Sequence, residues 1–98
     1  MVGARVDGLW RSWTGPYAWN VEWTERNGAL HRDIEFDSFS EAMAFMVRVG
    51  FIAEELQHHP EWSNVYNRVS IKLTTHDAGN MVTDIDRLMA ARIDDLSD

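Results

Sequence analysis

The spacing of apolar residues changes at Ser38, and this change constrains the fold more than any other feature of the chain. Upstream, apolar and polar residues alternate through most of residues 19–36, which is typical of half-buried strands. The dipeptide Asn27-Gly28 interrupts the alternation, and these residue types favour the positive φ angles of a type I′ turn. The sequence therefore predicts a β-hairpin.

Downstream of Ser38 the apolar residues follow the spacing of a helix. Ser38 and Glu41 match a capping box, in which each side chain bonds the backbone N–H of the other residue. The helix is expected to end near His58, because Pro60 pushes the residue before it out of the α region. The apolar stripe expected to face the core comprises Phe39, Ala42, Met43, Met46, Val49, Ala53 and Leu56, widened by Phe45 and Ile52.

The last third of the chain predicts further strands and a second helix. A short strand at residues 63–66 and a turn at Asn67-Arg68 precede an alternating strand at residues 69–73. Thr83 and Asp86 cap the final helix, and Asp86 lies in its first turn, where the helix dipole stabilises a carboxylate. The apolar side of this helix is expected to comprise Ile85, Leu88, Met89 and Leu96.

The order of these elements predicts the fold class. A hairpin, a helix, one or two strands and a helix are expected to form an α+β domain, an antiparallel four-stranded sheet with helices packed on one face. A chain of 98 residues makes one domain, residues 1–98. Within it, residues 1–17 show no lasting apolar period and are treated as a poorly defined N-terminal segment.

Composition and charge argue against several classes of function. The net charge of -7 argues against nucleic acid as a partner, because phosphate binding needs clustered Lys and Arg. Cysteine is absent, which excludes disulfides and thiolate metal ligands. No stretch approaches the ~20 apolar residues of a membrane span, and the N-terminus lacks the apolar segment of a signal peptide. We therefore expect a cytoplasmic protein without a membrane partner.

Three of the four histidines lie where predicted elements end. His58 and His59 close the first helix, and His76 follows the last strand. An imidazole, with its ordinary pKa of ~6.5, gives or takes a proton near neutrality. Two imidazoles in one pocket could serve as acid and base, each worth roughly 10²–10⁴-fold in rate. The fourth histidine, His31, is expected to be a solvated strand residue without a role.

Neighbouring side chains could support such a site. Glu54 lies four residues before His58, so the two would share a helix face. Glu54 or Asp86 could fix the tautomer of a histidine, and Pro60 would stiffen the segment that presents it. Trp62 could provide a flat apolar wall for a planar heterocycle.

Two other interpretations use the same histidines. A histidine at a helix C-terminus commonly caps carbonyl groups and meets the negative end of the helix dipole, and a bare His-His-Pro motif favours this interpretation. A zinc site formed by His58, His59 and His76 is conceivable, since imidazole is a good ligand. Adjacent helical residues point about 100° apart, however, so joint ligation by His58 and His59 is awkward and no metal is expected.

Three motifs in the second half of the chain stand at specific spacings, and two weaker patterns flank them. The motifs are Ala53-Glu54-x-x-x-His58-His59-Pro60, Tyr66-Asn67-Arg68-Val69 and Leu73-x-Thr75-His76-Asp77. The flanking patterns are Leu30-x-Arg32-x-Ile34-x-Phe36-x-x-Phe39-x-x-Ala42 and Asp86 followed by Met89-Ala90. Over about residues 19–96 they resemble the pterin-4a-carbinolamine dehydratase family, and this resemblance favours a catalytic site over a helix cap.

The resemblance implies a dehydratase. Such an enzyme removes water from 4a-hydroxytetrahydropterin (pterin-4a-carbinolamine), gives quinonoid dihydropterin in tetrahydrobiopterin recycling, and uses no metal or organic cofactor. His58 and His76 would be the main acid and base, in either order, with His59 assisting. The residues expected to bind or support the pterin include one chosen for its flat ring, Trp62, and six implied by the resemblance. They are Glu54, Pro60, Trp62, Thr75, Asp77, Ala78 and Asp86.

The resemblance also bears on partners. Family members form dimers and tetramers, so a homodimer or homotetramer is expected. Some relatives act as dimerisation partners of a transcription factor or as assembly helpers, which leaves a non-catalytic binding module with a protein partner as the alternative. Two features depart from the family's pattern. Residues 1–17 lack its opening helix, and the loop from His76 to Asp86 is one residue longer, with Asn80-Met81-Val82 where a Gly-Leu pair is common.

Overall fold

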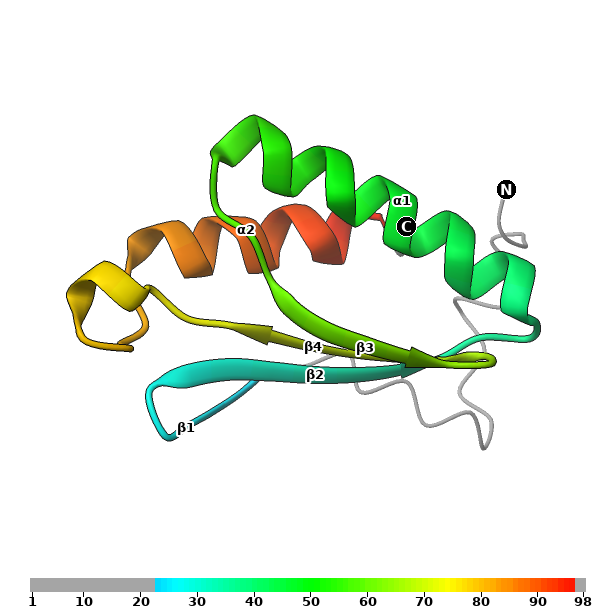
Figure 1. Cartoon of the computed structure of the whole chain (residues 1–98), viewed down its shortest axis with the longest axis horizontal. Helices are drawn as coiled ribbons and strands as arrows, with labels where there is room; N and C mark the ends of the chain where they lie inside the picture. Colours follow the sequence, from blue (N-terminus) through cyan, green and yellow to red (C-terminus); the bar gives the residue numbers. More distant parts are fainter. Residues whose placement is uncertain (1–22, 97–98) are drawn as a thin grey trace.

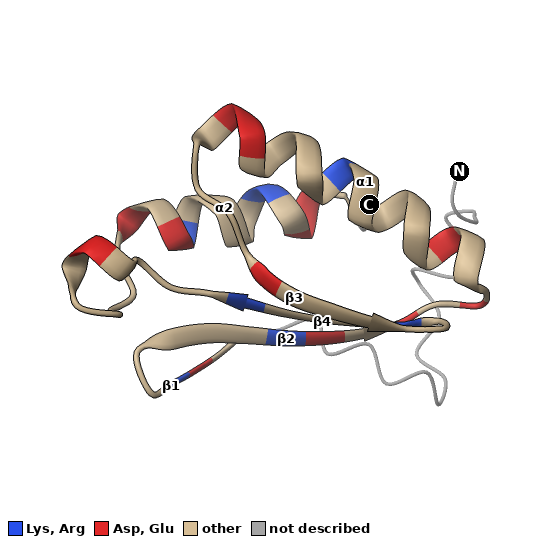
Figure 2. Cartoon of the chain, in the orientation of Figure 1, with Lys and Arg blue, Asp and Glu red and all other residues tan. Residues whose placement is uncertain are grey.

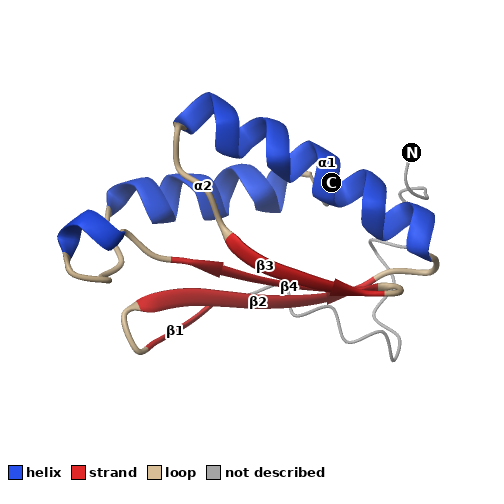
Figure 3. Cartoon of the chain, viewed as in Figure 1, coloured by secondary structure: helices blue, strands red, loops and turns tan. Residues whose placement is uncertain are grey.

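The structure is a computed structural model that describes residues 23–96. It has two layers, an antiparallel sheet and two helices that cover one face of it (Figure 1, Figure 3). The strand order is β1-β2-β4-β3, which confirms the predicted α+β class with a four-stranded antiparallel sheet. The segment at residues 1–17 lies outside the described residues. The elements are β1 (Thr24–Arg26), β2 (Ala29–Glu35), α1 (Phe39–Leu56), β3 (Glu61–Val65), β4 (Arg68–Leu73), the 3₁₀ helix η1 (His76–Ala78) and α2 (Asp84–Asp95).

The tip of the first hairpin has the backbone conformation that its residues favour. Asn27 and Gly28 have φ angles of 52° and 77°, as a type I′ turn requires. The flanking residues Arg26 and Ala29 pair across the two strands. The predicted hairpin is therefore confirmed at its turn and in the strand pairing next to it. The part of the predicted first strand before residue 23 lies outside the described residues.

The second hairpin begins earlier than the sequence indicated. β3 covers Glu61–Val65, and Val65 pairs with Arg68, so that Tyr66 and Asn67 form the turn. Tyr66 adopts a φ of 52° there. The prediction of a turn at Asn67-Arg68 was wrong, because the positive φ falls on a tyrosine, a residue type that carries no turn signal. The shift brings residue 61 into the sheet.

Helix α1 begins where expected and ends before His58. The Ser38 hydroxyl accepts a hydrogen bond from the Glu41 backbone N–H at 3.2 Å. At the other end Gln57 adopts a φ of 53°, and the His58 backbone N–H donates to the Ala53 carbonyl at 3.1 Å. This geometry is a Schellman-type cap. The backbone of His58 therefore closes the helix, and its side chain is available for other contacts.

The core lies between the sheet and the two helices. The expected core face of α1 was wrong at Phe39 and Met43, which are 45% and 42% exposed, whereas Phe45 and Ile52 are buried. Leu88 on α2 is likewise 48% exposed. Because α1 has apolar residues on several sides, spacing alone fits more than one buried face. The buried core comprises Leu30, Ile34, Ala42, Phe45, Val49, Ile52, Ala53, Val69, Ile71, Leu73, Met89, Ala90 and Ile93.

One charged side chain on the core face of the sheet ties β2 to the end of α2. Arg32 is buried, and its Nη1 lies 2.6 Å from Oδ1 of Asp94. The Trp23 indole N–H donates to the same oxygen at 2.9 Å. Burial lowers the pKa of Arg32, and the charge of Asp94 opposes this shift. These bonds attach α2 to the sheet, and the first turn of α2 carries Asp86.

Charged residues are unevenly spread along the helices. Figure 2 shows acidic bands towards both ends of α1 with a single basic band between them. Within residues 23–96, no helix has the length and apolar character needed to cross a bilayer.

Candidate active site

The two histidine motifs meet at the carboxylate of Asp86. This residue lies in the first turn of α2 and is fully buried. Its Oδ1 lies 2.5 Å from Nε2 of His58, and its Oδ2 accepts a hydrogen bond from the Thr75 hydroxyl at 2.6 Å. Because Thr75 directly precedes His76, one carboxylate joins the segment after α1 to the segment after β4.

Hydrogen bonds keep the buried Asp86 ionised. Burial alone raises the pKa of its carboxyl, but bonds from the Thr75 hydroxyl, the Thr83 backbone N–H and His58 outweigh this effect and lower the pKa. The Thr83 N–H lies 2.9 Å from Oδ2 and belongs to the capping box of α2. Since a carboxylate only accepts, Nε2 of His58 carries a proton, and Nδ1 is the basic nitrogen of the neutral ring.

His59 and Glu54 form a separate pair on the outside of the molecule. Nε2 of His59 lies 3.3 Å from Oε1 of Glu54, and the side chains are 62% and 74% exposed. An exposed pair of this kind contributes about 0–1 kcal/mol to stability. The expectation that Glu54 shares a helix face with His58 was wrong, because α1 ends at Leu56 and Gln57 redirects the chain.

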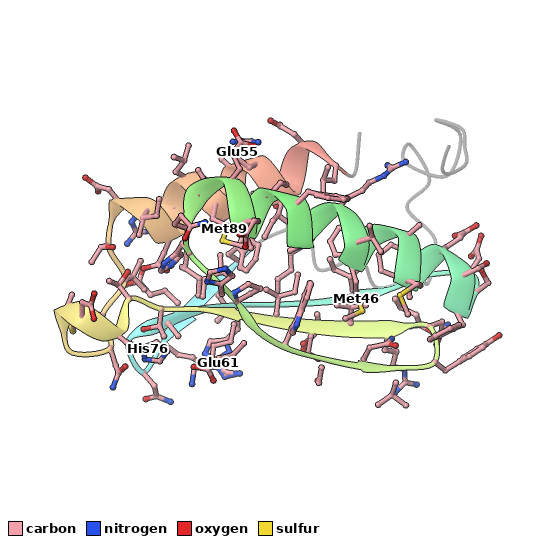
Figure 4. All side chains as sticks on the ribbon, turned by 45° about the horizontal axis from the view of Figure 1, so that its top comes forward. Met46, Glu55, Glu61, His76 and Met89 are labelled. Atoms are coloured by element: carbon pink, nitrogen blue, oxygen red, sulfur yellow. The ribbon has the colours of Figure 1, made fainter. Side chains whose placement is uncertain are left out.

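His76 is the most exposed of the three histidines and is contacted on both ring nitrogens. It begins η1, and its side chain is 68% exposed. Its Nδ1 lies 2.7 Å from Oδ1 of Asn80, and its Nε2 lies 3.5 Å from Oε2 of Glu61. Figure 4 shows the side chains of His76 and Glu61 side by side. Glu61 also lies 3.7 Å from the Lys72 ammonium, across the β3–β4 pairing.

Each of the three histidines therefore meets a different carboxylate. The carbonyl groups at the end of α1 are capped by backbone N–H groups, so the imidazoles do not serve as helix caps. Within the described part of the chain, no three His, Asp or Glu side chains are grouped to hold a metal ion. The ion pairs are His58 with Asp86, His59 with Glu54 and His76 with Glu61.

The other residues singled out from the sequence lie on the same two segments. Pro60 is half-buried and directly precedes β3. Trp62 is 37% exposed and pairs in register with Ile71, so it lies on the sheet face that the helices cover. Asp77 and Ala78 are exposed in η1.

The sequence did not point to Glu61 or Asn80, both of which contact His76. A strand that begins at Glu61 places this residue opposite Lys72, so the correct hairpin register is the signal that would have found it. For Asn80 the one available signal is its residue type, since asparagine tolerates a positive φ such as the 60° that it adopts here.

The sequence matches a family model described as "Pterin 4 alpha carbinolamine dehydratase" over residues 11–96. The chain belongs to this family. A pterin carbinolamine dehydratase relative from Synechococcus sp. (strain WH7803) is 57% identical over 74 residues, which cover 76% of this chain and 78% of that protein. One from Opitutus terrae (strain DSM 11246 / JCM 15787 / PB90-1) is 52% identical over 75 residues, covering 76% and 77%. Both bear the name "Putative pterin-4-alpha-carbinolamine dehydratase".

Solved structures share the fold of this pterin carbinolamine dehydratase family member. A transcriptional coactivator/pterin dehydratase from Brucella melitensis superposes with a TM-score of 0.73 at 40% identity, covering 78% of this chain and 82% of that one. A pterin dehydratase-like protein described as a RuBisCO assembly factor in the alpha-carboxysome has a TM-score of 0.63 at 23% identity, covering 78% and 87%. The second likeness concerns the fold alone.

The arrangement in this family member is suited to moving protons. The His58 side chain is 14% exposed and is held by a buried carboxylate, whereas the His76 side chain is 68% exposed and is held by an amide oxygen. Such a pair of rings can take a proton from one atom of a bound molecule and deliver a proton to another.

Proposed function

We propose that the protein is a pterin-4a-carbinolamine (4a-hydroxytetrahydropterin) dehydratase that acts in the cytoplasm in tetrahydrobiopterin recycling. The observation that carries the proposal is the buried Asp86 carboxylate, which bonds His58 directly and bonds Thr75 beside His76. In a member of this family, that link supports a shared site for the two histidines. The substrate is the pterin, and no metal or organic cofactor takes part.

Loss of water from this substrate requires two proton transfers and no change of oxidation state. One imidazole takes the proton from the ring nitrogen next to C4a, and the electron pair of that N–H bond forms the carbon–nitrogen double bond. The C4a–O bond breaks, its electrons leave with oxygen, and a protonated imidazole gives its proton to the departing hydroxyl. The products are water and quinonoid dihydropterin. His58 and His76 perform these transfers, in either order, and His59 assists.

The pterin is held between the two segments. Trp62 is partly exposed and provides a ring on which a flat heterocycle can stack. Asp77 and Ala78 are exposed, and in the proposed complex their backbone groups meet the polar edge of the pterin. Asp86 is fully buried, so its part in the reaction is to hold the ring of His58. Glu54 and Pro60 support the opposite wall.

Purified protein is expected to convert 4a-hydroxytetrahydropterin to the quinonoid product faster than buffer alone. The substrate can be generated in the cuvette and followed by its absorbance, in buffer with a chelator because no metal is required. His31→Ala is the matched control. His31 lies on β2, where it pairs with Lys72, and it is not one of the three proposed proton-transfer residues, so its loss should leave the rate unchanged. A rate equal to that of buffer would contradict the proposal.

We also propose that the protein forms a homodimer or homotetramer. Four exposed apolar residues recur every four positions along one side of α1, and we call them the α1 stripe. Contiguous exposed apolar surface of this kind marks interaction sites. Arg48 is the one basic residue of α1 and stands out as a single basic band in Figure 2. The α1 stripe comprises Phe39, Met43, Val47 and Phe51, which are 45%, 42%, 50% and 72% exposed.

The double substitution Val47→Glu with Phe51→Glu is expected to lower the mass of the particle by at least a factor of two. Charged side chains in the α1 stripe would have to be buried without partners in the interface. Sedimentation velocity measures this mass directly. Leu88→Glu is the matched control, since Leu88 is 48% exposed on α2, outside the stripe. A wild-type protein that sediments as a monomer would refute the proposal.

The α1 stripe also favours a second candidate function, a non-catalytic dimerisation or assembly-helper module on the same fold. In that case a partner protein would cover the stripe. The module function is supported if the purified protein has no dehydratase activity and retains a stoichiometric protein partner that the double glutamate variant loses. An active enzyme without such a partner excludes it.

A further inference from the structure

The loop between η1 and α2 folds back against His76. The carbonyl oxygen of Thr75 accepts backbone N–H bonds from Ala78 at 3.2 Å, Asn80 at 3.1 Å and Met81 at 3.4 Å. In the opposite direction the Thr75 N–H donates to Met81 at 3.0 Å. These bonds close residues 75–81 into a compact unit. The departure from the family's loop pattern, at residues 80–82, lies within this unit and just beyond it.

Asn80 uses this loop conformation to reach the ring of His76. It adopts a φ of 60°, which asparagine tolerates better than most residues, and it follows Gly79 at 79°. Its Oδ1 lies 2.7 Å from Nδ1 of His76. An amide oxygen only accepts, so Nδ1 carries the proton and Nε2 is the nitrogen of the neutral ring that exchanges protons. The other acceptor, Oε2 of Glu61, lies farther away, 3.5 Å from Nε2, and its side chain is itself 51% exposed. Without the shorter bond from Nδ1 to Asn80, the exposed imidazole would lose its preference for the Nδ1 proton.

The tip of the first hairpin supports Asn80 from behind. A Cβ added at Gly28 would lie 2.1 Å from the Asn80 carbonyl oxygen, so the two backbones are in direct contact. The Thr74 hydroxyl donates to the Gly28 carbonyl at 2.7 Å and holds the tip at this place. Gly28 therefore meets two requirements, the positive φ of its turn and the space for Asn80.

We propose that Asn80 is a positioning residue that fixes the orientation and tautomer of His76, and that the hairpin tip at Gly28 holds Asn80 in place. The proposal rests on the proposed dehydratase function and adds a determinant that lies outside the histidine motifs. Asn80 does not touch the substrate and acts through the ring of His76. Residues that are far apart in the sequence, in the first hairpin and after β4, thus set the geometry of one proton-transfer group.

Asn80→Gly is the variant that tests the side chain, because glycine tolerates the positive φ of this position and removes the side chain with its amide oxygen. Its turnover number is expected to fall about tenfold, a part of the roughly 10²–10⁴-fold contribution of an acid–base group, with little change in KM. Asn80→Asp retains an oxygen that accepts from Nδ1 and should restore most of the rate. A rate of Asn80→Gly equal to wild type would overturn the proposal.

The tautomer of His76 can be measured without the reaction. In the ¹⁵N NMR spectrum of the histidine-labelled full chain, wild type is expected to show His76 protonated at Nδ1 when neutral, and Asn80→Gly to lose this preference. The same tautomer in both proteins would refute the positioning role. If the wild-type protein has no dehydratase activity but the His76 tautomer differs between wild type and Asn80→Gly as expected, the proposed function fails while the positioning role stands.

Gly28→Ala tests the hairpin tip. The added methyl group must displace the Asn80 carbonyl, so the Nδ1 preference of His76 is expected to be lost in this variant as well. Asn27→Gly is the matched control, since it keeps the turn's positive φ and adds no atom at the contact. Thermal unfolding of both variants shows whether they are folded at the temperature of measurement. A folded Gly28→Ala protein with an unchanged His76 tautomer would exclude the role of the tip.

Discussion

Replacing His76 with alanine is expected to remove most of the dehydratase rate while leaving the fold intact. A general acid or base contributes roughly 10²–10⁴-fold, so kcat/KM should fall within that range. The side chain is 68% exposed, its polar contacts within residues 23–96 are with Asn80 and the exposed Glu61, and it is not part of the core, so stability should change little. Steady-state kinetics and thermal unfolding on the same sample measure both quantities.

The controls for this experiment come from the other histidines. His31→Ala is expected to keep the wild-type rate, whereas His58→Ala should lose as much as His76→Ala. His59 pairs with Glu54 at the surface, and its replacement should cost less than either. If His76→Ala retained the wild-type kcat/KM, the assignment of His76 as an acid or base would be wrong.

Asp86→Ala is expected to reduce both stability and rate. The substitution leaves three donors without their acceptor: the Thr75 hydroxyl, the Thr83 backbone N–H and Nε2 of His58. Removing one partner from a buried network of this kind costs about 3 kcal/mol of the free energy of unfolding. The rate should fall because His58 loses the group that fixes its tautomer and orientation. Urea unfolding at neutral pH and kinetics measure the two effects.

The contribution of Asp86 to stability should also depend on pH. Folding lowers the pKa of this carboxyl below its ordinary value of 3.8. Its contribution is therefore complete above that pH and is lost as the pH falls through the lowered pKa. The free-energy difference between wild type and Asp86→Ala should shrink on acidification below this value. A difference that is independent of pH in that range would contradict an ionised, hydrogen-bonded Asp86.

Two further variants separate the role of charge from that of packing. Asp86→Asn keeps an oxygen for Thr75 and Thr83 and should be more stable than Asp86→Ala, but still slow, because the amide group does not hold His58 as a carboxylate does. Asp84→Asn removes an exposed carboxylate from the same helical turn and should preserve both stability and rate. Equal losses in Asp84→Asn would show that the first turn of α2 matters only through its charge.

The parts of the fold that depend on local residue types agreed with the sequence. The positive φ angles at Asn27 and Gly28 and the bond from Glu41 to Ser38 involve residues a few positions apart, so residue type is sufficient to predict them. The end of α1 was less predictable. Gln57 adopts a positive φ although glutamine rarely does, and Pro60 alone indicates only the approximate position of the helix end.

The buried face of α1 could not be predicted from spacing. Phe39 and Met43 fit a helical stripe as well as Phe45 and Ile52 do, yet only the latter two are buried. Which side of such a helix faces the core depends on where the sheet and α2 lie. The residues that spacing misplaced now form part of the α1 stripe, for which we propose a second copy of the chain as partner.

The histidines could be singled out from the sequence, but their partners could not. Residue type and position singled out His58, His59 and His76 as candidates, because imidazole chemistry belongs to the residue itself, and the resemblance to the family then favoured a catalytic site over a helix cap. Only the tertiary structure decided which group each ring meets, including Asp86 for His58 and Asn80 for His76. The physical reason is that a hydrogen bond requires atoms within about 3 Å, and the backbone positions that bring them there depend on how α2, the hairpin tip and β4 pack together.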